Sequence, residues 1–284
     1  MTQSSTNELI THALEGNQDA LEKLLGEVQN LVFNLSLRML GTVSDAEDAS
    51  QEILVRVMTN LSSFRRESLF STWVYRIAVN YLQDCKKSMI AQRPLSFEFY
   101  GQDIEAGFID NGAVDLKGVD EDMLSEELKM SCTNVMLQCL DPESRSIYIL
   151  GTMFHIDSRV GGEILGMTSD NYRQKLSRIR RKMGDFLSSY CGLSKTGSCD
   201  CKKRIGYAVQ QKRLDPSRLE YSSLEQLDNG LLLDYKDRME HMDQLSGVFQ
   251  SLPRYKSTKS AEAFLKNLLK STNMQSIRNY GGNV

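Results

Sequence analysis

The chain has 284 residues, a length that suits one large domain or two to three small ones. It carries 34 Lys and Arg against 37 Asp and Glu, and this net charge of -3 excludes a uniformly basic nucleic-acid coat, so any contact with phosphate must be local. No apolar stretch approaches the ~20 residues that cross a bilayer, and the polar start MTQSSTNELI lacks the layout of a signal peptide. We therefore expect a soluble cytoplasmic protein with no membrane partner. Apolar residues at helical spacing and the near absence of alternating β-branched residues predict an all-α fold.

The first third of the chain shows the strongest helical spacing. Apolar residues at steps of three and four predict helices over residues 19–40, 45–61 and 70–87. Gly41 is expected to end the first helix. Ser44 followed by Glu47 has the spacing of a capping box, which places the start of the second helix near Asp45. We expect these helices to form one compact bundle over residues 7–88.

An acidic stretch follows the bundle. Residues 88–128 carry ten acidic residues against only Arg93 and Lys117, with scattered glycines and no sustained period. High charge and low hydrophobicity favour disorder. We interpret residues 89–127 as an acidic linker.

A helix-turn-helix is predicted in the second half of the chain. The sequence Asp141-Pro142 starts a helix with proline at a tolerated position. Two further helices are expected over residues 157–165 and 169–186, with Gly166 in the turn between them. We place this domain over residues 128–188.

The second of these helices carries a concentrated positive charge. Residues 171–183 read NYRQKLSRIRRKM, with six basic side chains and no acid. A recognition helix uses such a face, because Arg and Lys bind phosphates while residues near the helix start reach base edges in the major groove. The alternative is a solvated basic helix that packs against the acidic linker.

Two ordered segments resemble one protein family. Residues 16–87 resemble region 2 of bacterial RNA polymerase sigma factors, especially the extracytoplasmic-function (ECF) group, and residues 140–186 resemble their region 4. The strings that carry the resemblance are DAEDASQEILVRV, FSTWVYRIAVN, LDPESRSIYIL and GEILGMTSDNYRQKLSRIRRKM. The resemblance implies a helical bundle linked to a helix-turn-helix domain, in a sigma factor that directs core enzyme to promoters. Region 4 would read the minus-35 element and region 2 would melt the minus-10 element, with no catalytic residues and no enzyme activity.

The resemblance also assigns roles to residues. It implies polymerase docking by Asp45, Asp48, Gln51 and Glu52, although acids near the positive end of a helix dipole also stabilise the helix itself. It implies minus-10 contacts by Phe64, Arg65, Arg66, Arg76, Asn80, Lys86 and Lys87. The minus-35 contacts are expected from Asn171, Arg173, Gln174, Lys175, Arg178 and Arg181. We assign Trp73 to the core, because it lies on an apolar stripe.

Two adjacent positions depart from the family pattern. Gly161 and Gly162 stand where many relatives have Ile-Ala, and glycine weakens a helix by about 1 kcal/mol per residue. Close packing between the two helices would explain both glycines.

Residues 189–284 form a C-terminal extension that a minimal sigma factor of this group lacks. Its thiols Cys191, Cys199 and Cys201 could bind zinc as thiolates, with a fourth ligand such as His241 or Cys139. A redox-sensitive thiol group and plain structural cysteines are alternatives, and no cofactor is required. Basic residues up to position 213 are expected to add nonspecific DNA affinity. Amphipathic segments near its end suggest a helical module that restrains the two DNA-binding parts.

The expected partners are core RNA polymerase and promoter DNA, with an anti-sigma factor as a further candidate and a monomer when free. The alternative function is a stand-alone helix-turn-helix regulator that does not bind polymerase. A third interpretation is a zinc or redox module whose cationic helix binds RNA or an acidic protein.

Overall fold

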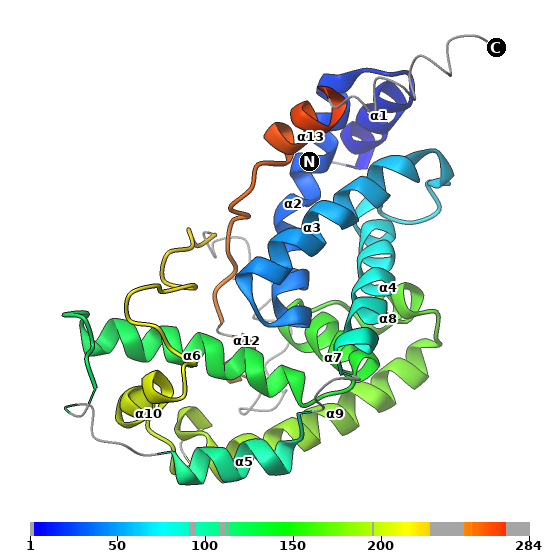
Figure 1. The fold of residues 1–284 in the computed structure, drawn as a ribbon. Helices are drawn as coiled ribbons and strands as arrows, with labels where there is room; N and C mark the ends of the chain where they lie inside the picture. The colour runs from blue at the N-terminus through cyan, green and yellow to red at the C-terminus, as the bar shows by residue number, and fades with distance from the viewer. Residues whose placement is uncertain are drawn as a thin grey trace.

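The computed structural model describes residues 3–90, 95–107, 112, 114–194, 196–227, 247–250 and 252–270. Over these ranges every regular element is a helix, and the only pairing of β type is an isolated bridge between Gln226 and Tyr255 (Figure 1). The predicted all-α fold is confirmed.

The N-terminal bundle is built around one long helix. Its elements are α1 (Gln3–Leu14), α2 (Gln18–Leu40), α3 (Val43–Thr59), the short η1 (Leu61–Ser63) and α4 (Phe70–Ile90). Helix α2 packs against α1, α3 and α4 and therefore forms the centre of the bundle. It ends as predicted at Gly41, which adopts the left-handed conformation with φ 94° and donates its amide to the Leu37 carbonyl.

The start of α3 differs from the prediction. Thr42, and not Ser44, is the N-cap: its backbone is extended, and its hydroxyl accepts a hydrogen bond from the Asp45 amide. The same hydroxyl donates to the Asp45 carboxylate at 2.7 Å. The capping pair is thus Thr42 and Asp45, two residues before the predicted one, because only Thr42 has the non-helical backbone that a cap requires.

The predicted linker contains a helix. Helix α5 (Phe97–Ala106) buries Tyr100 and Ile104 and packs against the later helix α9. Helix α6 (Glu121–Gln138) begins at the Asp120 N-cap and runs without interruption across residue 128, where the domain boundary was placed. The acidic stretch therefore packs against the protein in this structure.

The helix-turn-helix follows α7 (Pro142–Tyr148) and a π-helical turn, η3 (Ile149–Met153). It consists of α8 (Ser158–Leu165), the left-handed Gly166 and α9 (Ser169–Tyr190). A Cβ on Gly161 would lie 2.5 Å from the Tyr172 ring, and one on Gly162 would lie 2.6 Å from the Met167 carbonyl oxygen. The two helices cross too closely for larger residues, as the sequence suggested.

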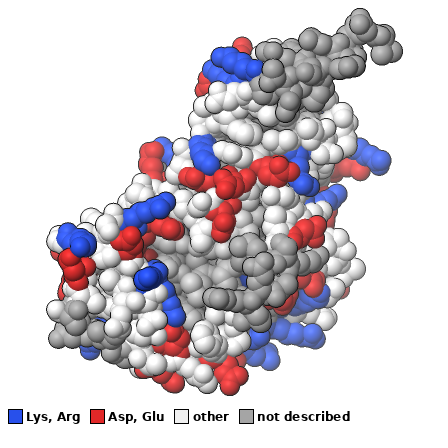
Figure 2. Space-filling model, viewed as in Figure 1, with Lys and Arg blue, Asp and Glu red and all other residues white. Residues whose placement is uncertain are grey.

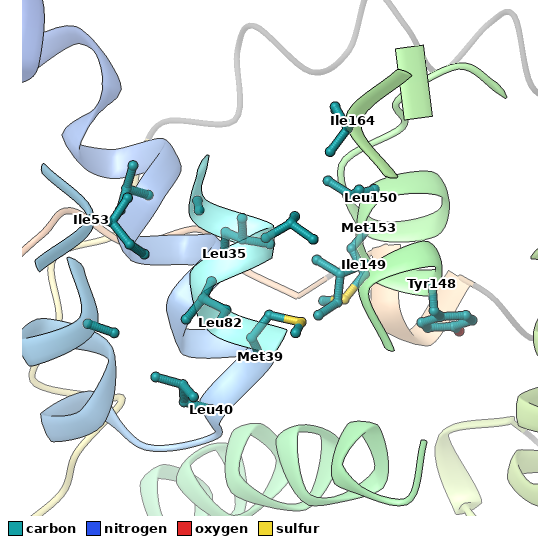
Figure 3. Close-up of a cluster of buried hydrophobic side chains, with 14 of the residues drawn as sticks. Leu35, Met39, Leu40, Ile53, Leu82, Tyr148, Ile149, Leu150, Met153 and Ile164 are labelled. Carbon is teal, nitrogen blue, oxygen red and sulfur yellow. The ribbon is translucent and has the colours of Figure 1, made fainter. Parts of the chain in front are cut away.

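One hydrophobic core joins the two halves of the molecule. Figure 3 shows Leu35, Met39 and Leu82 of the N-terminal bundle facing Ile149 and its neighbours from η3, and all of these are fully buried. The buried Arg145 guanidinium crosses the same boundary. It donates at 2.8 Å to the Met39 carbonyl and also to the carbonyls of Leu137, Gln138 and Leu140.

The C-terminal extension wraps around both halves. Its described helices are η4 (Gly192–Ser194), η5 (Lys202–Arg204), α10 (Ile205–Gln210), α12 (Gly247–Gln250) and α13 (Ala261–Lys270). Figure 1 shows the segment before α13 running along the bundle, which leaves α13 beside α2.

Candidate polymerase and nucleic-acid interfaces

Helix α3 presents acidic side chains opposite its buried face. Its apolar residues, among them Ile53 and Val57, face α2 and α4, while Asp48 is exposed and Asp45, Gln51 and Glu52 are half-buried. Glu47 lies on this side as well, and acidic atoms gather over α3 in Figure 2. We call Asp45, Glu47, Asp48, Gln51 and Glu52 the acidic face of α3. It contains all the residues that the resemblance assigned to polymerase docking.

A cavity of about 410 Å³ lies between the end of α3 and the middle of α4. Its lining residues are Arg56, Asn60, Ser63, Trp73, Ile77, Asn80, Tyr81, Asp84 and Cys85. Trp73 and Tyr81 offer ring surfaces, and Asn60 and Asn80 offer amides that can both donate and accept hydrogen bonds. An unpaired base needs these two kinds of contact, stacking and edge hydrogen bonds, to offset the loss of its partner.

The rim of this cavity is held by a short chain of contacts. Arg56 lies 4.7 Å from the centre of the Tyr81 ring and donates to the Glu52 carboxylate at 2.9 Å. Glu52, at the end of the acidic face, is therefore linked to the wall of the cavity. Asn80 was predicted from the sequence, but Arg56, Asn60 and Tyr81 were not, because they come together only when α3 and α4 pack.

Phe64 is not placed for DNA contact, which corrects the expectation for this residue. Its side chain is 8% exposed, and its ring packs 5.6 Å from that of Phe70 and 5.3 Å from that of Trp73. The ring packs on Phe70 and Trp73 of α4 and so fixes the loop between α3 and α4. Trp73 shares this aromatic cluster and also lines the cavity, so its assignment to the core describes only one side of the ring.

The predicted minus-10 arginines differ in their surroundings. Arg65 is exposed in the loop before α4. Arg66 has a left-handed backbone and donates to the Thr11 hydroxyl at 2.7 Å, which ties the loop to α1. Arg76 is 45% exposed and pairs with Glu163 of α8 at 3.2 Å. The side chains of Lys86 and Lys87 lie outside the described residues.

Helix α9 separates apolar from cationic side chains. Tyr172, Leu176, Ile179 and Met183 are buried, on a helix that packs mainly against α7 and α8. The predicted minus-35 residues Asn171, Arg173, Gln174, Arg178 and Arg181 are all exposed, and Lys175 is partly exposed. Basic atoms line the lower right of Figure 2, where α9 runs. The outward face of α9 thus has the charge that contact with phosphate requires.

Some basic groups of α9 already have protein partners. Arg180 donates to the Gly151 carbonyl at 2.9 Å and to the Thr152 hydroxyl at 3.0 Å, so it fixes the helix to η3. Lys175 pairs with Glu143 at 2.5 Å. Arg180 therefore serves the fold, while Arg178 and Arg181 stay on the outer face.

Three basic residues of the extension pair with acids of α5 and of the first turn of α6. Arg204 and Arg213 both pair with the buried carboxylate of Asp103, and Lys202 pairs with Asp122. Burial opposes ionisation of Asp103, but hydrogen bonds from Arg213 and Tyr207 hold its pKa below the ordinary value. Arg204 and Arg213 are thus held by Asp103, while Lys203 and Lys212 are exposed, and nonspecific DNA binding by this stretch stays a prediction.

The predicted metal residues have an unexpected neighbour. Cys191, Cys199 and Cys201 line one small cavity together with Cys132 of α6, and not with Cys139. Burial raises the pKa of Cys132 and of Cys201 to about 12. Across the part of the chain that the structure describes, no three His, Cys, Asp or Glu residues form a group suited to a metal ion. Zinc at these thiols stays a prediction, and His241 lies outside the described residues.

Comparisons with known proteins identify the family of this chain. The sigma-70 region 2 family matches residues 24–88. The ECF RNA polymerase sigma factor SigW of Bacillus subtilis is 28% identical over 176 residues, which cover 61% of this chain and 92% of that protein. The ECF RNA polymerase sigma-E factor of Escherichia coli is 33% identical over 133 residues, which cover 45% of this chain and 67% of that protein. The chain belongs to the ECF RNA polymerase sigma factors. It is a sigma factor that directs RNA polymerase to promoters, and its role is regulatory. Nothing in the comparisons favours the stand-alone regulator.

The ECF sigma factor is also similar to solved structures of known complexes. One is the structure of CnrH in complex with the cytosolic domain of CnrY, with a TM-score of 0.45, 19% identity and coverage of 63% of this chain and 94% of that one. Among the helices that the structure describes, none combines the length and apolar character needed to cross a membrane.

Proposed function

We propose that this sigma factor uses three surfaces in promoter opening. The acidic face of α3 docks on a basic surface of core RNA polymerase. The cavity between α3 and α4 holds an unpaired base of the minus-10 element, and the outer face of α9 binds the minus-35 element. The protein works in the bacterial cytoplasm, where both partners are found.

The cavity is the observation that carries this proposal. Helix packing around it combines two aromatic rings with two amides, and Arg65 is exposed on the loop between the same two helices. A flipped base would stack on Trp73 or Tyr81 while Asn80 bonds to its edge, and Arg65 would contact a neighbouring phosphate.

Replacing Asn80 by alanine tests the role of the cavity. We expect Asn80→Ala to retain polymerase binding but to reduce strand opening at the minus-10 element, measured by permanganate reactivity of unpaired thymines in the holoenzyme. Gln83→Ala is the matched control, because Gln83 lies on the same helix but donates to Ser146 at 3.1 Å instead of lining the cavity. Equal strand opening by wild type and Asn80→Ala would refute the role of this cavity.

A further inference from the structure

Residues 252–270 cross the N-terminal bundle and reach its acidic helix. We call them the strap. The strap is extended up to residue 260 and continues as α13, which packs on α2 and α3 (Figure 1). The segment thus connects the C-terminal extension with the surface assigned above to polymerase docking.

Buried polar groups of α2 bind the strap backbone. The Asn34 amide oxygen accepts from the Tyr255 amide at 2.9 Å, and its nitrogen donates to the Tyr255 carbonyl at 2.7 Å. Arg38 donates to the Pro253 carbonyl at 2.7 Å. Both α2 side chains are only 2% exposed. Burying a polar side chain without a hydrogen-bond partner is costly. The strap backbone supplies these partners to Asn34 and Arg38.

The same pattern continues toward α13. The Asn30 side chain accepts from the Ser257 amide at 3.0 Å, and the Gln29 side chain accepts from the Ala261 amide at 2.6 Å. Side chains on successive turns of α2 therefore fix the register of the strap and determine where its next residues lie.

That register places a lysine on the acidic face of α3. Lys259 lies 3.4 Å from the Glu47 carboxylate and 3.3 Å from that of Asp48, and the Thr258 hydroxyl bonds to Glu47. The strap has five basic residues and one acidic residue, so its charge is complementary to α3. It supplies the kind of cationic contact that a basic polymerase surface would make.

The strap also contacts the second half of the molecule. Arg254 donates to the Met153 carbonyl at 3.3 Å and lies 4.9 Å from the centre of the Phe154 ring. Just before the strap, Phe249 packs edge-on against Tyr148, with 5.4 Å between ring centres. One continuous region therefore holds η3 and α7 while it covers part of α3.

We propose that the strap occupies the polymerase-docking surface of the free chain and competes with the basic surface of polymerase for Glu47 and Asp48. This inference rests on the proposed function of α3. When a docking surface is exposed in only a fraction of the molecules, the measured affinity falls by that fraction. Release of the strap would expose α3 and remove the Arg254 contacts with η3 in the same step.

Affinity of the full-length chain for core RNA polymerase tests the proposal. Lys259→Ala should bind polymerase about two- to fivefold more tightly, the range that loss of an exposed ion pair supports. Lys266→Ala is the control on the same strap, because Lys266 pairs with Glu262 within α13 and should leave affinity unchanged. An unchanged or weaker affinity of Lys259→Ala would overturn the proposal.

Hydrogen exchange gives a second readout that does not depend on the variants. The amides of Tyr255, Ser257 and Ala261 should exchange slowly in the free chain and faster in the polymerase complex. Retained protection in the complex would show that the strap stays on α2 and does not compete.

Charge reversal on α3 separates the two proposals. Asp48→Lys should abolish polymerase binding if α3 is the docking surface. If Asp48→Lys binds normally, the proposed function of α3 is wrong. If it fails to bind, while Lys259→Ala matches wild type and the strap stays protected, only the competition is wrong.

Discussion

The close crossing of α8 and α9 gives a prediction whose size follows from the structure. In Gly162→Ala the new methyl group would lie 2.6 Å from the Met167 carbonyl oxygen and 3.3 Å from the Ser169 nitrogen. Overpacking costs about 1–3 kcal/mol, while replacing glycine by alanine in a helix returns about 1 kcal/mol. Since the clash is with backbone and cannot be relieved by a side-chain rotation, the cost lies in the upper part of that range, at about 2–3 kcal/mol, and we expect a net loss of about 1–2 kcal/mol.

Thermal unfolding of the full chain measures this loss. A net change of that size lowers Tm by about 2–8 °C for a protein of this size class. Gly26→Ala is the control, because Gly26 lies inside α2 with no atom within 4 Å of the added Cβ. It should raise stability by about 0.5–1 kcal/mol. If Gly162→Ala were as stable as wild type, the close crossing of α8 and α9 would be wrong. We also expect Gly162→Ala to weaken binding to minus-35 DNA.

Three further predictions address charge and thiols. Arg178→Ala should weaken binding to minus-35 DNA and lower the slope of log affinity against log salt concentration by about 1. Arg180→Ala should mainly lower Tm, because Arg180 holds η3. Equal effects of the two variants on DNA binding and on Tm would contradict the division of α9. The pKa of Asp103 is lowered in the folded chain, so its contribution to stability is complete above the pKa of the unfolded chain and is lost as the pH falls through the folded pKa. The free energies of unfolding of wild type and Asp103→Asn, measured in urea, should therefore converge in acid. A difference between the two that does not change with pH would exclude this linkage. Burial raises the pKa of Cys201 to about 12, so iodoacetamide at pH 8 should modify it far more slowly in the folded chain than in urea, and equal rates would show that the thiol is not buried as described.

Periodicity predicted the long helices because the spacing of apolar residues within one segment is enough to identify a helix. Helix α2 has apolar residues at regular steps and a glycine at its end, and both features appear in the structure at the predicted places. The N-cap of α3 was misplaced because Thr42 and Ser44 both precede an acid by three residues, and only the backbone of Thr42 distinguishes them.

Contacts between distant segments could not be predicted in this way. Helix α5 was missed because its buried residues, Tyr100 and Ile104, lie in an acidic stretch without sustained periodicity. Their burial depends on contact with α9. The strap has no periodicity before α13, and Tyr255 meets Asn34 across 221 positions of sequence. The place of Cys132 beside Cys199 was missed as well, since nothing local in the sequence links the two thiols.

The candidate site was predicted in part, through the resemblance to a family. That resemblance located the acidic face of α3, Asn80 and the outer face of α9. It could not show that Phe64 is buried or that Arg76 pairs with Glu163, because both depend on how the elements of this chain pack.

Reconstitution with core RNA polymerase would show whether this chain directs the enzyme to promoters. The full-length chain and core enzyme would be incubated with fragmented genomic DNA, and the transcripts would be sequenced from their starts. We expect run-off transcripts that begin at a fixed distance from a two-part motif, and we expect Asp48→Lys to abolish them. Binding of the chain to DNA without any association with polymerase would contradict it.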